Sequence, residues 1–167
     1  MAEPASETVA TPQTIVIRSR RFGTYEVPAA RVITFAAGLI GFPDLHRFAL
    51  LETPRPRSPF RFLISVDLPE IAFVVCNPQD FWPGYAAEVP APSDPHGDLA
   101  VLVMVTVPAN PHDMTANLMA PLVIDSESRR GVQIVVDTGR YSTRHPLLSA
   151  GSAAQGAAQG SSDPSAL

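Results

Sequence analysis

The sequence predicts an all-β, mostly antiparallel domain, built as a small barrel or sandwich with long irregular loops. Short apolar runs alternate along the chain with connections rich in Pro, Gly and Asn, which is the pattern of many short strands. No segment has the 3.6-residue apolar period of a long amphipathic helix, and the sequence contains no heptads or internal repeats. A sheet of short strands limits its open edges when it curls into a barrel or a sandwich.

The predicted domain spans residues 14–148, between two tails of different composition. Residues 1–13 are small, polar and punctuated by proline, which predicts a flexible N-terminal arm. Residues 149–167 are mostly Ala, Gly, Ser and Gln, which bury too little apolar surface to offset the entropy of ordering, so a disordered tail is expected. The first half of the domain has predicted strands at 14–19, 23–27, 31–35 and 47–52.

A hairpin is the clearest local prediction. Apolar and polar side chains alternate over residues 60–66, residues 67–70 have turn chemistry, and an apolar strand returns over 71–76. A four-residue loop pairs Val66 with Ile71, Ile64 with Phe73 and Phe62 with Val75, and places all six side chains on one face. The same register puts Cys76 opposite Arg61. Such cross-strand pairs stabilise a sheet by roughly 0.2–1 kcal/mol each.

The second half of the domain is predicted to hold its central strands. Residues 99–105 are apolar without interruption, which predicts a strand covered on both faces. An apolar segment over 114–124 and the run 132–137 provide two more strands. Residues 77–95 form a proline-rich excursion, and an irregular loop of this length usually has a function or a protected packing role.

The composition indicates a reducing compartment and argues against nucleic acid as a direct partner. The formal net charge is −4, whereas a nucleic-acid-binding protein normally presents a basic stripe. Cys76 is the only cysteine, so no internal disulfide can form. The N-terminus holds acidic residues and no apolar core, which is not the pattern of a signal peptide, and a cytoplasmic protein without a membrane partner is expected.

No catalytic, cofactor-binding or metal-binding constellation is recognisable. The loop residues His96, Asp98, His112 and Asp113 are bounded by prolines and lack the spacing of a zinc site. Cys76 lies near the end of an apolar strand, where a buried and unreactive thiol is the common case. We therefore expect no enzyme activity, no cofactor and no metal.

Blocks of sequence in both halves of the domain carry a resemblance to a known family. In the first half they are Phe22-Gly23, Val32–Phe35, Gly38–Pro43, Arg47-Phe48, Ser65–Asp67, Pro69-Glu70 and Asn77-Pro78. In the second half they are Thr115–Ile124, Arg130-Gly131 and Tyr141–Pro146. In this order the blocks resemble the FliW family of flagellar assembly factors, over roughly residues 15–148.

The resemblance implies a non-enzymatic protein of flagellum biogenesis. Proteins of this family bind flagellin in the cytoplasm, in the manner of a chaperone, and also bind the RNA-binding translational regulator CsrA. The implied mechanism is an exchange of partners, in which unexported flagellin occupies the protein, frees CsrA and stops the translation of flagellin. In the family, antagonism of CsrA is allosteric.

Four residues are predicted to contact these partners. Asp67 and Glu70 form an acidic turn that would steer a basic regulator towards the protein. Phe81 and Trp82 would help to hold flagellin, although aromatic side chains below a long loop more commonly only pack.

Two other functions are compatible with the residues. A small metal-dependent hydrolase would use the His and Asp residues of the loops, and stoichiometric bound metal would reveal it. A barrel-type binder of single-stranded nucleic acid would use Arg18, Arg20 and Arg21 with aromatic stacking platforms, and a salt-sensitive interaction with RNA would reveal that function.

Overall fold

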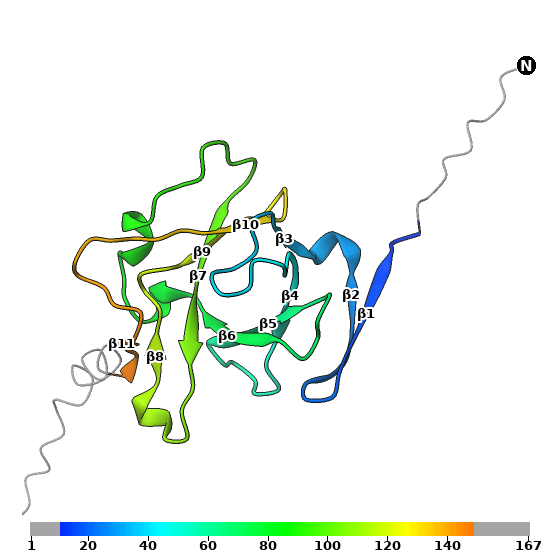
Figure 1. The fold of residues 1–167 in the computed structure, drawn as a ribbon, viewed down its shortest axis with the longest axis horizontal. Helices are drawn as coiled ribbons and strands as arrows, with labels where there is room; N and C mark the ends of the chain where they lie inside the picture. Colours follow the sequence, from blue (N-terminus) through cyan, green and yellow to red (C-terminus); the bar gives the residue numbers. More distant parts are fainter. Residues whose placement is uncertain (1–10, 149–167) are drawn as a thin grey trace, which may run out of the picture.

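The computed structural model describes residues 11–148, which form a closed β barrel (Figure 1). The barrel strands are β3 (Ile33–Phe35), β4 (Arg47–Glu52), β5 (Phe60–Ser65), β6 (Ala72–Cys76), β7 (Leu99–Thr106), β9 (Leu122–Asp125) and β10 (Arg130–Gln133). They pair in the order β7-β6-β5-β4-β3-β10-β9, and β9 pairs again with β7, which closes the ring. The predicted all-β, barrel-like fold class is confirmed. The tail over 149–167 and most of the predicted arm lie outside the described residues.

The barrel is antiparallel at every strand pair except β3–β10. These two strands run parallel and pair through Thr34 with Arg130 and Phe35 with Gly131. Parallel neighbours need a long connection, and here most of the barrel lies between them in the sequence. A local interpretation of hairpins cannot find such a pair, because only the closure of the ring brings the two strands together.

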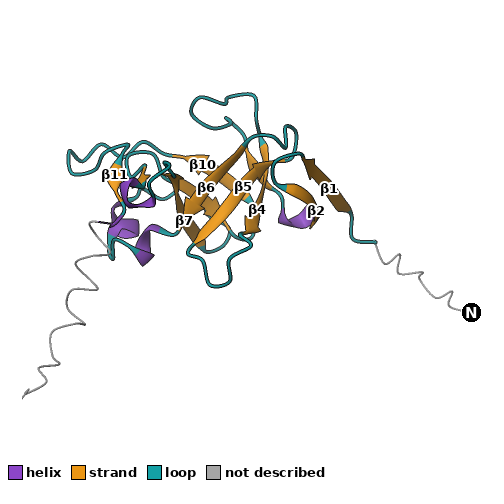
Figure 2. Cartoon of the chain, turned by 90° about the horizontal axis from the view of Figure 1, so that it is seen from below, coloured by secondary structure: helices purple, strands orange, loops and turns teal. Residues whose placement is uncertain are grey.

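Two smaller pieces of sheet lie outside the ring. β1 (Thr14–Ser19) and β2 (Gly23–Pro28), which correspond to the strands predicted at 14–19 and 23–27, form a hairpin that lies beside β4 and β5 (Figures 1 and 2). β8 (Thr115–Ala116) pairs with β7, and β11 (His145–Pro146) pairs with β8. The short 3-10 helices of the described residues are η1 (Ala29–Arg31), η2 (Pro78–Asp80), η3 (Tyr85–Glu88) and η4 (Pro111–Asp113).

The interior of the barrel is an apolar cluster. Phe35 and Phe48 are fully buried there, with their rings edge to face and their centroids 5.6 Å apart. Leu63, Val75 and Leu122 pack in the same cluster and are also inaccessible to solvent. Burial of an apolar side chain of this size stabilises a fold by roughly 1.5–3 kcal/mol, so this interior is a main source of the stability of the barrel.

The outer face of β4 and β5 is also covered. Ile17 and Val27 of the β1–β2 hairpin pack against Ala49 and Ile64 in a second buried cluster. Both faces of these two strands are therefore apolar, as the consecutive buried residues Leu63 and Ile64 illustrate. Alternation along such a strand does not reveal which face points into the barrel.

The predicted register of the β5–β6 hairpin is wrong by one residue. Leu63 lies opposite Phe73 and Phe62 lies opposite Val74, so Phe62 and Phe73 are on different faces of the sheet. Cys76 faces Phe60 rather than the predicted Arg61. The physical reason is the loop: the Ser65 N–H donates to the Ile71 C=O at 2.9 Å, which leaves five residues between the strands instead of four. A slip of one residue exchanges the two faces of a strand.

Candidate partner-binding surfaces

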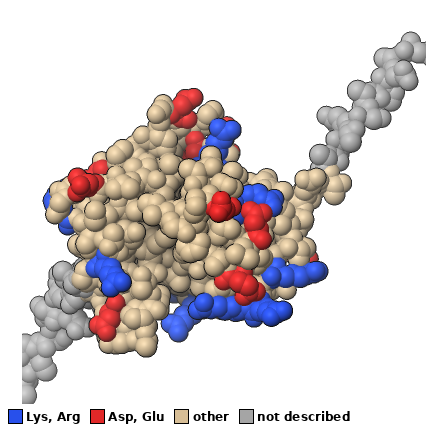
Figure 3. Space-filling model, viewed as in Figure 1, with Lys and Arg blue, Asp and Glu red and all other residues tan. Residues whose placement is uncertain are grey.

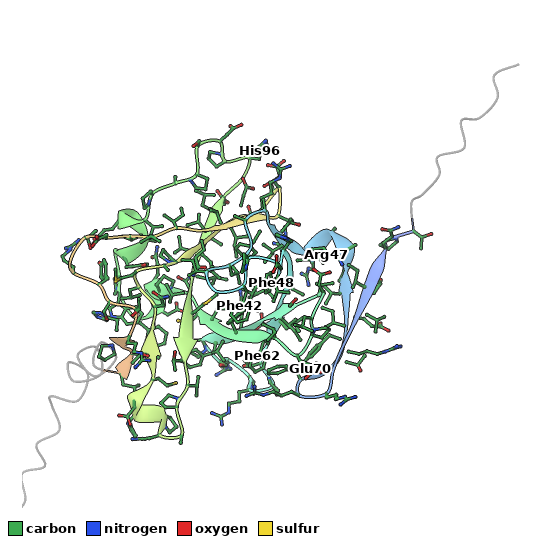
Figure 4. All side chains as sticks on the ribbon, in the orientation of Figure 1. Phe42, Arg47, Phe48, Phe62, Glu70 and His96 are labelled. Carbon is green, nitrogen blue, oxygen red and sulfur yellow. The ribbon has the colours of Figure 1, made fainter. Side chains whose placement is uncertain are left out.

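The acidic turn between β5 and β6 makes contacts within the protein itself. The Asp67 carboxylate pairs with the Arg47 guanidinium, with Nε and Oδ1 3.0 Å apart. The Glu70 carboxylate accepts the backbone N–H of Arg20, with the two atoms 2.8 Å apart. Figure 4 shows Arg47 and Glu70 at the side of the barrel next to the β1–β2 hairpin. The two predicted steering residues therefore tie their loop to β4 and to this hairpin, and both remain accessible enough for a partner to reach.

The two predicted flagellin-contacting aromatic residues lie at the opposite end of β6. Phe81 stacks on Phe60, with ring centroids 6.1 Å apart, and Trp82 meets His145 edge to face at 5.5 Å. Both are half-buried, in the cluster that the 77–95 excursion covers. β6 has five residues and spans roughly 16 Å, so the structure places the aromatic pair and the acidic turn on separate surfaces.

The histidines that suggested a metal site are separated and act through their backbones. The N–H of His96 donates to the Asp125 carboxylate at 2.6 Å, and the N–H of His112 donates to the Asn110 side chain at 3.2 Å. Within residues 11–148, no three His, Cys, Asp or Glu side chains are grouped so that they could hold a metal ion. Cys76 is buried, and burial, with a smaller contribution from Asp80, raises the pKa of its thiol to about 12.

Asp125 connects two loops at one end of the barrel, a role that was not predicted from the sequence. Its carboxylate accepts the backbone N–H groups of His96 and Gly97 from one loop and of Glu127 and Ser128 from the next, at 2.6–3.3 Å. These donors, with that of Ser128 the strongest, hold the pKa of Asp125 well below its ordinary value. The sequence signal was an acid directly after the apolar run of β9 and before the polar residues 126–128.

The basic turn of the β1–β2 hairpin lacks a free aromatic platform. Arg18, Arg20 and Arg21 are exposed, and none of them forms an ion pair within the described part of the chain. The neighbouring Phe22 ring, however, packs against Phe62 with centroids 5.4 Å apart, and the Arg21 guanidinium covers it. Bases therefore find no aromatic face for stacking here, so this turn does not favour the single-strand nucleic-acid alternative.

An uncharged groove lies between the loop after β3 and strand β10. It encloses about 430 Å³ and is lined by residues 36–41, Pro43 and residues 131–133, none of which is charged. Figure 3 shows that the middle of the face seen in Figure 1 carries few charged side chains. In the sequence this segment stands out only as Gly38–Pro43, one of the blocks that carry the family resemblance, and no pattern in it predicts a groove.

Two glycines shape the walls of the groove. Gly38 has a φ of +67°, and a Cβ at this position would lie 2.5 Å from the Pro43 carbonyl oxygen. Gly131 lies against the ring of Phe35, where a Cβ would come within 2.4 Å of Cε1. The Gln133 side chain joins the two walls, because its Oε1 accepts the Ile40 N–H at 2.8 Å. Contacts within the chain therefore set the shape of the groove.

Residues 11–148 define a small closed β-barrel protein whose acidic turn, aromatic pair and uncharged groove lie at separate places on the barrel. The sequence pattern of the FliW protein family matches residues 16–147. The chain belongs to the FliW family, whose members are non-enzymatic flagellar assembly factors. The resemblance found in the sequence blocks and the prediction that the chain is not an enzyme are thereby confirmed.

Individual relatives agree with this assignment. The flagellar assembly factor FliW of Caldanaerobacter subterraneus is 37% identical over 139 residues, which are 79% of this chain and 92% of that protein. That of Natranaerobius thermophilus is 38% identical over 149 residues, covering 84% of this chain and 98% of that protein. A crystal structure of the flagellar assembly factor FliW superimposes with a TM-score of 0.69, at 31% identity, over 79% of this chain and 96% of that one. No helix among the described residues is long and apolar enough to span a membrane.

Proposed function

We propose that this protein is a cytoplasmic flagellar assembly factor that binds flagellin and antagonises a CsrA-type RNA-binding regulator. The observation that carries the proposal is the family match over residues 16–147, together with a barrel that superimposes on a FliW crystal structure. The protein couples the synthesis of flagellin to its export by exchanging partners. While flagellin is exported the protein holds the regulator, and when flagellin accumulates it occupies the protein and releases the regulator.

The two partners are assigned to different surfaces. Glu70 pairs with no cation among residues 11–148, so it provides a negative charge that attracts a basic regulator, while Asp67 is partly neutralised by Arg47. The half-buried Phe81 and Trp82 present the remainder of their rings to flagellin. Charge steering chiefly raises the association rate, whereas an apolar contact chiefly slows dissociation.

The test is a three-component binding experiment with flagellin and the CsrA-type regulator of the same bacterium. Purified protein is titrated with each partner by calorimetry, and the preformed complex with the regulator is then titrated with flagellin. We expect binding to each partner and release of the regulator as flagellin is added. A protein that binds neither partner, or one whose complex with the regulator is insensitive to flagellin, contradicts the proposal.

A further inference from the structure

Strand β10 has an unpaired edge next to the uncharged groove. β3 accompanies β10 only as far as Gly131, yet β10 continues in an extended conformation, with the N–H of Ile134 bound to Pro121 and the N–H of Val136 bound to Met119. The main-chain groups of Ile134 and Val136 therefore point towards β9 and the segment that precedes it. Because successive residues of a strand alternate in direction, the N–H and C=O groups of Gln133 and Val135 point towards the groove.

No residue of the described chain satisfies this edge. The main-chain groups of Gln133 and Val135 have no hydrogen-bonding partner on the groove side within residues 11–148. The cause is the end of β3: the Gly38 N–H donates to the Phe35 C=O at 2.9 Å, and the chain turns away from β10. An unpaired strand edge is a ready template for another extended chain.

The surroundings of this edge are apolar. Ile40 and Val132, which line the groove, are 62% and 38% exposed, and Val135, two residues beyond Gln133, is 62% exposed. Charged residues make up 17% of the sequence, but none lines the groove. A charged segment placed here would lose its hydration without gaining a counter-charge, whereas an uncharged apolar segment would lose little.

We propose that an extended, uncharged, apolar segment of flagellin docks in this groove and adds as a strand along the edge of β10. The partner backbone pairs with Gln133 and Val135, and its apolar side chains cover Ile40 and Val132. Addition of a strand to an open edge is a recurrent mode of peptide recognition, with affinity from the backbone and specificity from the pockets. The inference rests on the proposed function for the identity of the partner, and it gives that partner a second contact surface in addition to the aromatic pair Phe81 and Trp82.

The first test is the double variant Ile40→Asp with Val132→Asp, two residues that line the groove, measured by calorimetry against flagellin of the same bacterium. The matched control is Val16→Asp with Val107→Asp, which places the same two charges on residues that are 46% and 52% exposed and lie away from the groove. We expect the groove variant to bind at least about tenfold more weakly and the control to stay within about twofold. Thermal melting of both variants checks that they fold. A groove variant that folds and binds within about twofold of the wild type overturns the proposal.

The second test does not depend on flagellin and separates the two proposals. A synthetic hexapeptide, acetyl-Thr-Val-Thr-Val-Thr-Val-amide, is added to labelled protein, with the Thr-Glu repeat as its control, and backbone amides are followed by NMR. We expect shifts and slowed hydrogen exchange at the amides of Gln133 and Val135 with the Val peptide only. If wild-type protein ignores flagellin but responds to the peptide in this way, the proposed function fails while the strand-adding edge stands.

Two results of the peptide test would contradict the docking site. One is the absence of any change at the amides of Gln133 and Val135 with peptide at millimolar concentration. The other is protection of these amides in the free protein that grows with protein concentration, together with a dimer in light scattering. That result would make a second copy of this chain the occupant of the edge and would overturn the assignment to flagellin.

Discussion

The barrel interior and the Asp125 junction hold this molecule together by different chemistry. The interior around Phe35 and Phe48 consists of apolar side chains in contact, and its cluster contains no ionisable group. The junction consists of one carboxylate that accepts four backbone N–H groups from two loops. Apolar packing responds to shape and volume and is insensitive to pH, whereas the junction depends on the charge of one residue. The two regions should therefore fail under different perturbations.

The largest effect is expected in the interior, from Phe48→Ala. The Phe48 ring is fully buried, so its loss should lower the free energy of unfolding by about 3–5 kcal/mol, a large share of a total of roughly 5–15 kcal/mol. Urea unfolding measures the change. The matched control is Phe73→Ala, whose ring lies 6.4 Å from that of Phe48 but is only half-buried. If the control loses as much stability as Phe48→Ala, the degree of burial does not determine how much each ring contributes to the stability of the barrel.

A smaller interior effect is expected from overpacking at Gly131. In Gly131→Ala the new methyl group would meet the Phe35 ring within 2.4 Å, and such a clash typically costs about 1–3 kcal/mol. The double variant Gly131→Ala with Phe35→Leu removes the ring edge, so the two changes should be less destabilising together than the sum of their separate costs. Urea unfolding of all three variants completes the cycle, and strict additivity would show that the methyl group finds room elsewhere.

The contribution of the Asp125 junction to stability should depend on pH, because it requires the ionised carboxylate. The folded-state pKa of Asp125 is depressed, so its ionised form stabilises the fold above the ordinary value of 3.8 and this contribution disappears as the pH falls through the folded pKa. Asp125→Asn should lower the Tm at neutral pH, by less than the interior changes, and the gap to the wild type should shrink below about pH 4. Asp98→Asn, at an exposed position nearby, is the control and should leave the melting profile unchanged. A gap that is constant with pH would show that the ionised carboxylate is not the stabilising species.

The smallest effect on stability is expected at the acidic turn. Its carboxylates are exposed, whereas the Asp125 carboxylate is buried. Asp67→Asn with Glu70→Gln should cost about 1 kcal/mol or less, since exposed ion pairs contribute little. The regulator should associate more slowly and with a flatter dependence on salt, while flagellin binding changes less. Stopped-flow kinetics at low and high salt measure this, with Asp94→Asn and Asp98→Asn as a control of equal charge change. If the association rate of the regulator and its dependence on salt are unchanged, the turn does not steer the regulator and has only a structural role.

The positions of several strands could be predicted from local sequence, and their pairing could be predicted only in part. The strands at 14–19, 23–27 and 47–52 were expected within a residue of where they lie, because each is bounded by turn residues. The closing strand was expected at 132–137, but its paired part begins at Arg130. Arg130 and Gly131 are not an apolar run, so hydrophobicity alone did not mark them as part of a strand. Gly131 is required there because the Phe35 ring occupies the place of a side chain.

For the candidate surfaces too, the residues could be predicted from the sequence, but their contacts could not. Asp67, Glu70, Phe81 and Trp82 could be chosen from residue type and from their place in loops, but their partners within the protein could not be read from the sequence. Arg47 reaches Asp67 and His145 reaches Trp82 only after distant segments have come together. The groove is a consequence of where β3 ends relative to β10, and these two strands are neighbours only in the closed barrel.

The sequence by itself determined that this chain is an all-β protein of the FliW family and that it lacks a recognisable catalytic motif, because these properties depend on residue order and on short-range pattern. Only the tertiary structure decided the register of β5 and β6, the parallel closure of β10 on β3, the role of Asp125 and the uncharged groove. Each of these arises from contacts between residues far apart in the chain. The free energy of such contacts depends on which faces become buried together. When a strand is apolar on both faces, its local sequence does not predict which face points into the barrel.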